Sequence, residues 1–136
     1  MARRGIMKTW DDVKKFILDK YKDEASNDEN DGLKVKRNFK DGRSQVVHVN
    51  RLDCNETGNW VQIKSPCGLI DHNKLDSVLE YLNDSKCGGL VKIRGCYYIR
   101  HAMPIDDLSE NEFDGPFRYV ASYADHIEKK WVGDDK

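Results

Sequence analysis

Several features that would assign this sequence to a familiar functional class are missing from it. No apolar run approaches the roughly 18 residues of a membrane span, and the N-terminus shows no signal-peptide pattern. We therefore expect a cytoplasmic protein. Neither sign of charge is in excess, since 23 basic and 24 acidic residues leave a net charge of -1. Without a long-range field to attract phosphates, nucleic acid is not expected as the partner, and neither is a membrane.

Closely spaced cysteines are also absent. Cys54, Cys67, Cys87 and Cys96 lie too far apart to form a CxxC pair, so the sequence indicates neither a zinc knuckle nor a redox dithiol. A chain of 136 residues buries a core without crosslinks. We therefore expect free thiols, no metal, no cofactor and a single domain over residues 1–136 with flexible ends.

The titratable side chains form no recognisable catalytic motif. No histidine has a second His or Cys at metal-ligand spacing. Cys96 and His101 are close in sequence, but five positions along a strand place them on opposite faces of a sheet. The sequence therefore predicts a protein that is not an enzyme, with a small hydrolase that uses Cys and His as an alternative.

Amphipathic helices are present at the start and near the middle of the chain. Thr9 is a predicted N-cap, and apolar residues at helical spacing predict a helix over about residues 10–23. The acidic segment at about 23–32 has almost no apolar side chains and predicts a mobile connector. Asp71 is the predicted N-cap of a second helix over about 72–86.

A third helix is predicted at the C-terminal end. Ser109 and Glu112 match a capping box, after which apolar residues recur at steps of four and three. They form one seam, which consists of Phe113, Phe117, Val120, Ala124, Ile127 and Trp131. Pro116 conflicts with a continuous helix, so we expect a short first turn that breaks and restarts there.

Strand patterns fill the rest of the chain. Asp41 and Gly42 lie between two β-type runs and favour a type I′ hairpin turn. If the loop has two residues, Val35 pairs with His48 and apolar side chains fall on both faces. Either a bulge then shifts the register, or the second strand is covered on both sides, by helices on one and by a partner on the other. A third strand over residues 60–64 is expected to stop before Pro66. A second hairpin is predicted around residues 94–95. The order predicts an α+β fold: helix, three-stranded antiparallel meander, helix, β-hairpin and C-terminal helix.

Three segments of the chain carry a family resemblance. They are WVQIKSPCG (60–68), CGGLVKIRGCYYIRHAMPIDDL (87–108) and YVASYADHIEKKWVGDD (119–135). In this order they resemble the type III secretion chaperone-like fold of class I secretion chaperones and YbjN-type proteins. The resemblance implies a homodimer without a cofactor, whose sheet and first helix hold an extended segment of a client protein on shallow apolar surfaces.

The hairpin pattern supports a binding role independently. Apolar side chains on both faces of one hairpin would leave a surface that needs cover from a partner. We therefore hypothesise a non-catalytic, homodimeric protein- or peptide-binding module of chaperone or adaptor type. A regulatory or immunity-type protein that blocks one target is an alternative. The candidate contact residues are Phe16, Tyr21, Val35, Val47 and Val49.

Overall fold

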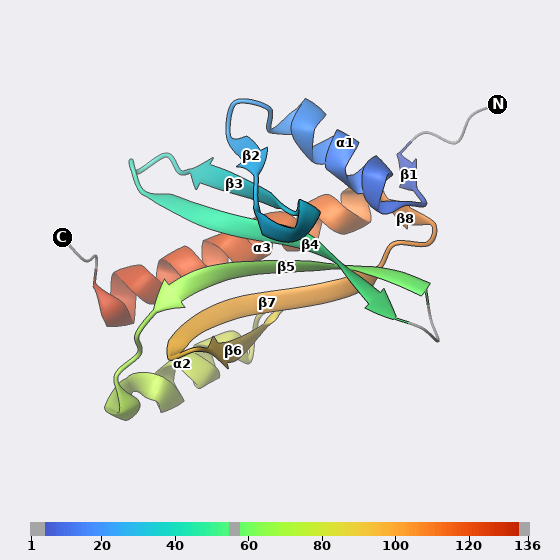
Figure 1. The fold of residues 1–136 in the computed structure, drawn as a ribbon. Helices are drawn as coiled ribbons and strands as arrows, with labels where there is room; N and C mark the ends of the chain where they lie inside the picture. The colour runs from blue at the N-terminus through green and yellow to red at the C-terminus, as the bar shows by residue number, and fades with distance from the viewer. Residues whose placement is uncertain (1–4, 55–57, 134–136) are drawn as a thin grey trace.

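The protein combines antiparallel sheets with three α-helices, and the computed structural model describes residues 5–54 and 58–133 (Figure 1). The strands are β1 (Ile6–Met7), β2 (Ala25–Asn27), β3 (Leu33–Asn38), β4 (Ser44–Cys54), β5 (Gly58–Gly68), β6 (Gly89–Ile93), β7 (Cys96–Pro104) and β8 (Leu108–Ser109). The helices are α1 (Trp10–Lys20), α2 (Leu75–Leu82) and α3 (Glu110–Ile127). The predicted α+β class and the predicted order of helix, meander, helix, hairpin and helix are confirmed. Within these two ranges, no helix has both the length and the apolar character needed to span a bilayer.

Six strands form the main sheet in the order β2-β3-β4-β5-β7-β6, and all neighbouring pairs are antiparallel. β1 and β8 form a separate two-stranded sheet. α3 lies along one face of the main sheet, against β4, β5 and β7, while α1 lies beside the start of α3 (Figure 1). We call the face under α3 the inner face and the opposite one the outer face.

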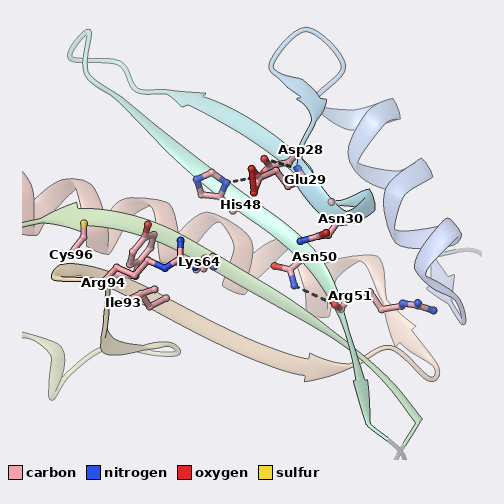
Figure 2. A pocket seen from close by; sticks show the side chains of 12 residues that line it. Asp28, Glu29, Asn30, His48, Asn50, Arg51, Lys64, Ile93, Arg94 and Cys96 are labelled. Carbon is pink, nitrogen blue, oxygen red and sulfur yellow. Dashed lines mark hydrogen bonds and ion pairs between the residues drawn. The ribbon is translucent and has the colours of Figure 1, made fainter.

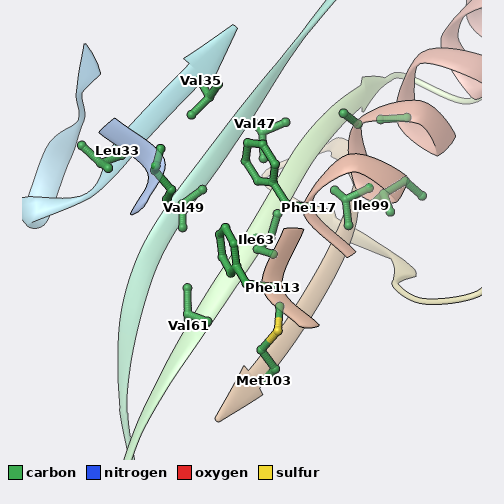
Figure 3. Close-up of a cluster of buried hydrophobic side chains, with 14 of the residues drawn as sticks. Leu33, Val35, Val47, Val49, Val61, Ile63, Ile99, Met103, Phe113 and Phe117 are labelled. Carbon is green, nitrogen blue, oxygen red and sulfur yellow. The ribbon is translucent and has the colours of Figure 1, made fainter. Parts of the chain in front are cut away.

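The inner face and α3 together form most of the hydrophobic core (Figure 3). Alternate strand residues point inward because side chains along a strand change face at every position. They include Leu33, Val35, Val47, Val49, Val61, Ile63 and Ile99. From α3, the predicted seam residues Phe113, Phe117, Val120, Ala124 and Ile127 are buried, so the predicted seam is confirmed over that helix.

The first hairpin differs from the predicted register by one residue. Val35 pairs with Val47, and Lys34 pairs with His48. A shift of one position moves every side chain of a strand to the other face. The predicted pairing of Val35 with His48 is therefore wrong, and Val35, Val47 and Val49 share the inner face.

The turn between β3 and β4 explains this shift. A type I′ turn needs positive φ at both central residues, yet of Asp41 and Gly42 only Gly42 has it, at 88°. The backbone N–H of Phe39 donates to the carbonyl of Arg43 over 2.8 Å, which closes a turn of three residues instead of two. The extra turn residue sets the observed register.

Two other strand predictions have opposite outcomes. Pro66 does not end β5, which continues to Gly68 with a shift of register that accommodates a residue lacking an N–H. The second hairpin is confirmed, because Arg94 and Gly95 form its two-residue turn with φ values of 50° and 85°. Here both positions have the positive φ that a type I′ turn requires.

The first two helices are shorter than predicted. Thr9 caps α1 as expected, in a capping box with Asp12, but the helix ends at Lys20. α2 begins only at Leu75, after a 3-10 turn at His72–Lys74, and Asp71 makes no capping hydrogen bond. The segment predicted as a connector contains β2, which pairs with β3. Backbone pairing needs no apolar side chains, so composition alone did not indicate this strand.

α3 begins as predicted and continues past its proline. Ser109 accepts a hydrogen bond from the Glu112 N–H, and the Glu112 side chain accepts one from the Ser109 N–H. The expected break at Pro116 is wrong, since the helix is continuous from Glu110 to Ile127. Phe113 and Phe117 are buried on either side of Pro116, and their packing offsets a penalty of about 3 kcal/mol for an internal proline.

Candidate functional site

The structure places the three candidate valines in the core. Val35 and Val47 are 0% exposed and Val49 is 1% exposed, and all three belong to the hydrophobic core on the inner face (Figure 3). A client segment could contact these side chains only after the elements that cover the inner face had moved away from the sheet. The valines therefore do not line an accessible surface in this structure.

The two candidates from the first helical region lie in the contact between α1 and α3. Tyr21 is buried, its ring lies 5.0 Å from that of Phe117, and its hydroxyl donates to the Asp114 carboxylate. Phe16 is partly buried, with its ring edge-on to Phe113 at 5.9 Å. The five predicted contact residues are thus core or core-edge positions.

A polar surface occupies the outer face instead. The pairing of the strands brings four side chains that can carry positive charge into one straight row across the sheet. Lys34 on β3 is opposite His48 on β4, His48 is opposite Lys64 on β5, and Lys64 is opposite Arg100 on β7. We call these four residues the cationic row. Because adjacent strands lie roughly 4.8 Å apart, the row spans about 14 Å.

The two middle members of the row, His48 and Lys64, line a hollow of about 680 Å³ on the outer face. Figure 2 shows Asp28 and Glu29, from the segment between β2 and β3, on one side of this hollow. Lys64, Arg94 and Cys96 lie on the other side, on β5 and the hairpin of β6 and β7. The hollow is therefore walled by elements that are distant in sequence.

His48 has a carboxylate partner at the edge of the hollow. Its Nδ1 atom lies 2.7 Å from Oδ2 of Asp28, and this hydrogen bond holds the pKa of the Asp28 carboxyl below its usual range. A carboxylate at Nδ1 fixes the ring and leaves Nε2 as its second polar atom. Lys64, a cation, is the cross-strand neighbour of His48. Within the described residues, His48 has no hydrogen bond to a Ser, Thr or Cys side chain, which is the contact that a catalytic triad of the Ser-His-Asp type requires.

A chain of amides supports the opposite end of the row. Arg100 donates its Nε–H to Oε1 of Gln62, and Gln62 donates through Nε2 to Oδ1 of Asn50 over 3.0 Å. These contacts involve only one of the guanidinium nitrogens, so the two terminal nitrogens of Arg100 have no hydrogen bond within the described ranges. A guanidinium held this way can receive a carboxylate through two parallel bonds.

The edge of the sheet beside this surface is open. In the hairpin of β6 and β7, Ile93 pairs with Cys96 next to the two-residue turn, so Ile93, Val91 and Gly89 direct their backbone groups toward β7. By the same alternation, the N–H and C=O groups of Leu90 and Lys92 point away from the sheet. β6 is the last strand of its sheet, and no hydrogen bond to these outward groups is present in the described part of the chain.

Cys96 and His101, the cysteine and histidine that are close in sequence, do not face each other. Cys67 is fully buried, which raises the pKa of its thiol to about 12 and keeps it protonated at neutral pH. Cys96 lines the hollow, whereas His101 lies on the other face of β7, as predicted. Burial lowers the pKa of His101, whose Nδ1 accepts a hydrogen bond from the Gly88 N–H. Within residues 5–54 and 58–133, no three His, Cys, Asp or Glu side chains gather as a possible metal site.

Sequence reasoning missed the cationic row for a definable reason. Lys34 and Lys36 alternate with Leu33 and Val35, which does indicate a polar face on β3. The alignment of residues from four strands depends on the register, and the turn after β3 has one residue more than its Asp-Gly signal suggests. The correct turn length gives the pairing of Lys34 with His48, whereas Lys64 and Arg100 join the row only through the pairing of β4 with β5 and of β5 with β7.

None of the protein-family models matches this chain, and no curated protein matches it either. The resemblance to secretion chaperones therefore stays a prediction. The functional argument below rests on the geometry of the chain itself.

Proposed function

We propose that this protein is a non-catalytic, homodimeric module of chaperone or adaptor type, which binds an extended segment of another protein at the open edge of β6. The observation that carries the proposal is the outward direction of the Leu90 and Lys92 backbone groups on the last strand of the sheet. An extended peptide can satisfy such groups by adding one strand. The outer face then supplies side-chain contacts beside the added strand.

The composition of β6 suits reversible pairing better than polymerisation. The strand has only five residues, and Lys92 places a charge on its edge. Short, charged edges limit uncontrolled sheet extension, so a partner with matching side chains is favoured over random association. A regulatory protein that blocks one target would use the same edge, and identification of the partner separates these two functions.

A cytoplasmic location is part of the same proposal. Cys67, Cys87 and Cys96 are free thiols in the structure. Proteins of reducing compartments keep cysteines in this form, whereas disulfides form in oxidising ones. The free thiols support the location.

The edge pairing can be tested with a change of one backbone group. Lys92→Pro removes the outward N–H without removing a bond to β7, so the protein should fold and lose peptide binding by about tenfold or more. Peptides of about eight residues, the length of an ordinary strand, would be selected from a random display library against the wild-type protein. Their affinities for wild type and variant would be measured by fluorescence anisotropy.

Lys92→Ala is the matched control, because it removes the same side chain and keeps the N–H. It should bind the selected peptides as the wild type does. Amide chemical shifts should change at Leu90 and Lys92 on binding. Unchanged affinity in Lys92→Pro, or a library that yields no binding peptide, would contradict the proposal.

The proposed homodimer has a candidate contact on α2. Val78 is buried, whereas the neighbouring Leu79 is 48% exposed, and Leu69 before the helix is 70% exposed. Leu79→Lys should convert the dimer to a monomer, since it places a charge where apolar surface would be covered. Sedimentation equilibrium would give the mass of each form. Leu18→Lys, at an exposed leucine on α1, should leave the dimer intact, and a monomeric wild-type protein would rule the dimer out.

A further inference from the structure

In the cationic row, the permanent cations Lys64 and Arg100 lie directly opposite each other, an arrangement that works against the stability of the fold. The members of the row lie directly opposite one another on neighbouring strands, in three successive cross-strand pairs. Like charges in directly opposed positions destabilise a sheet. A row that the fold does not need for its own stability is a candidate binding surface.

Several arginines outside the row have carboxylate partners. Arg37 pairs with Glu24 at 3.2 Å, and Arg43 pairs with Asp125 at 2.8 Å. In the described part of the chain, Lys34, Lys64 and Arg100 form no ion pair, and Asp28 pairs only with His48. Three of the four positions therefore hold a cation without a carboxylate at ion-pair distance, although the charge of Lys34 does act on Asp28.

The side chains at one end of the row are held in position. Arg100 is fixed through Gln62, and the ammonium of Lys64 lies 5.6 Å from the centre of the Tyr98 ring. A preorganised cation loses less conformational entropy when it binds an anion. The Arg100 end of the row is thus prepared for a carboxylate.

Gly89 provides access to that end from the open edge. It pairs with Arg100 and stands between this arginine and the edge of the sheet. A Cβ atom placed on Gly89 would meet nothing within 4 Å. Glycine in a strand often marks a place where another backbone or a ligand approaches closely. A residue of an added strand opposite Gly89 would therefore face the guanidinium with no side chain between them.

We infer that the cationic row selects acidic segments, so that the bound polypeptide carries Asp or Glu at the positions that face the outer surface. The inference rests on the proposed function and specifies its ligand. A nucleic acid fits less well, because the net charge of -1 offers no steering field and Asp28 and Glu29 stand at the other end of the row. An acidic peptide needs only a few carboxylates to match the row.

Two synthetic peptides of about eight residues test this selectivity. In both peptides a charged residue alternates with an uncharged one, which is threonine or valine. The charged residue is glutamate in one peptide and lysine in the other. The glutamate peptide should bind the full-length protein about tenfold or more tightly, and the difference should shrink as salt screens the charges. Fluorescence anisotropy gives both affinities.

Three variants connect the preference to the row. Arg100→Gln and Lys64→Gln should each reduce the preference for glutamate severalfold, and Lys64 takes no part in the bond between Arg100 and Gln62. Lys40→Gln, in the turn between β3 and β4, removes a positive charge outside the row and should leave the preference unchanged. Circular dichroism confirms that each variant is folded.

The possible results separate the two proposals. Equal affinity for both peptides overturns the acidic selectivity and leaves edge binding in place. Binding of neither peptide, together with no library-selected binder, overturns both. Tighter binding of a single-stranded uridine oligonucleotide than of the glutamate peptide overturns the choice of an acidic polypeptide. A preference for glutamate that disappears in both row variants supports the inference.

Discussion

Replacement of Val47 by aspartate is expected to unfold the protein. The side chain is fully buried beneath α3, so an aspartate there would place an unpaired carboxylate in the core. The loss should exceed about 4 kcal/mol, a large share of the roughly 5–15 kcal/mol by which folded domains are stable. Urea titration followed by circular dichroism would measure the free energy of unfolding.

Val46→Asp is the matched control for this experiment. Val46 is the preceding residue on β4 and pairs with Lys36 on the partly exposed outer face. An aspartate there should change the stability by less than about 1 kcal/mol and can interact favourably with the lysine. Similar losses in the two variants would contradict the observed register, and a folded Val47→Asp protein would return Val47 to the candidate contact surface.

Replacement of Asp114 by alanine is expected to loosen α1 from α3. The Asp114 carboxylate is buried, accepts the hydrogen bond of the Tyr21 hydroxyl and pairs with Lys20 at 3.0 Å. Its removal leaves the buried hydroxyl without this acceptor, so we expect a loss of about 3 kcal/mol. Chemical denaturation would measure it. Asp19→Ala, an exposed position on α1, should change the stability by no more than about 0.5 kcal/mol.

The contact between Tyr21 and Asp114 also predicts a pH dependence. Burial, with the hydrogen bond and the charge of Asp114, raises the pKa of the Tyr21 hydroxyl far above its usual value near 10. The folded state therefore holds this proton more tightly than the unfolded state. Its contribution to stability is complete below pH 10 and falls as the pH rises above 10.

Tyr21→Phe should flatten this alkaline decline. The free energy of unfolding of the wild-type protein and the variant would be compared at several pH values between about 8 and 11, on both sides of the ordinary tyrosine pKa. Parallel curves for the two proteins would show that Tyr21 ionises as freely as an exposed tyrosine. In that case the hydrogen bond to Asp114 would not be the link between α1 and α3.

The order of elements could be predicted because local signals decide it. Ser109 and Glu112 mark the start of α3, and Arg94 and Gly95 form the predicted second turn. Such signals act over a few residues and are independent of the rest of the fold. The strand end expected before Pro66 and the helix break expected at Pro116 are wrong for the opposite reason. Packing of the surrounding sheet and helix outweighs the local preference of each proline.

The candidate site was harder to predict because it combines distant residues. The sequence predicts Val47 as a contact residue because a two-residue turn would leave apolar side chains of the hairpin on both faces. The observed register differs by one position and places Val47 on the inner face with Val35. Lys64 and Arg100 become neighbours only through the pairing of β5 with β7. The open edge of β6 also depends on strand order, since a strand is an edge only when no other strand follows it in the sheet.

The turn at residues 40–42 determines which chemistry β4 presents to the surroundings. Its length sets whether valines or polar residues of β4 face α3. Loss or gain of one codon there during evolution would exchange the two sets at once, although every strand residue stayed the same. In a search for proteins that share this binding surface, conserved turn length is therefore a better criterion than conservation of the lysines alone.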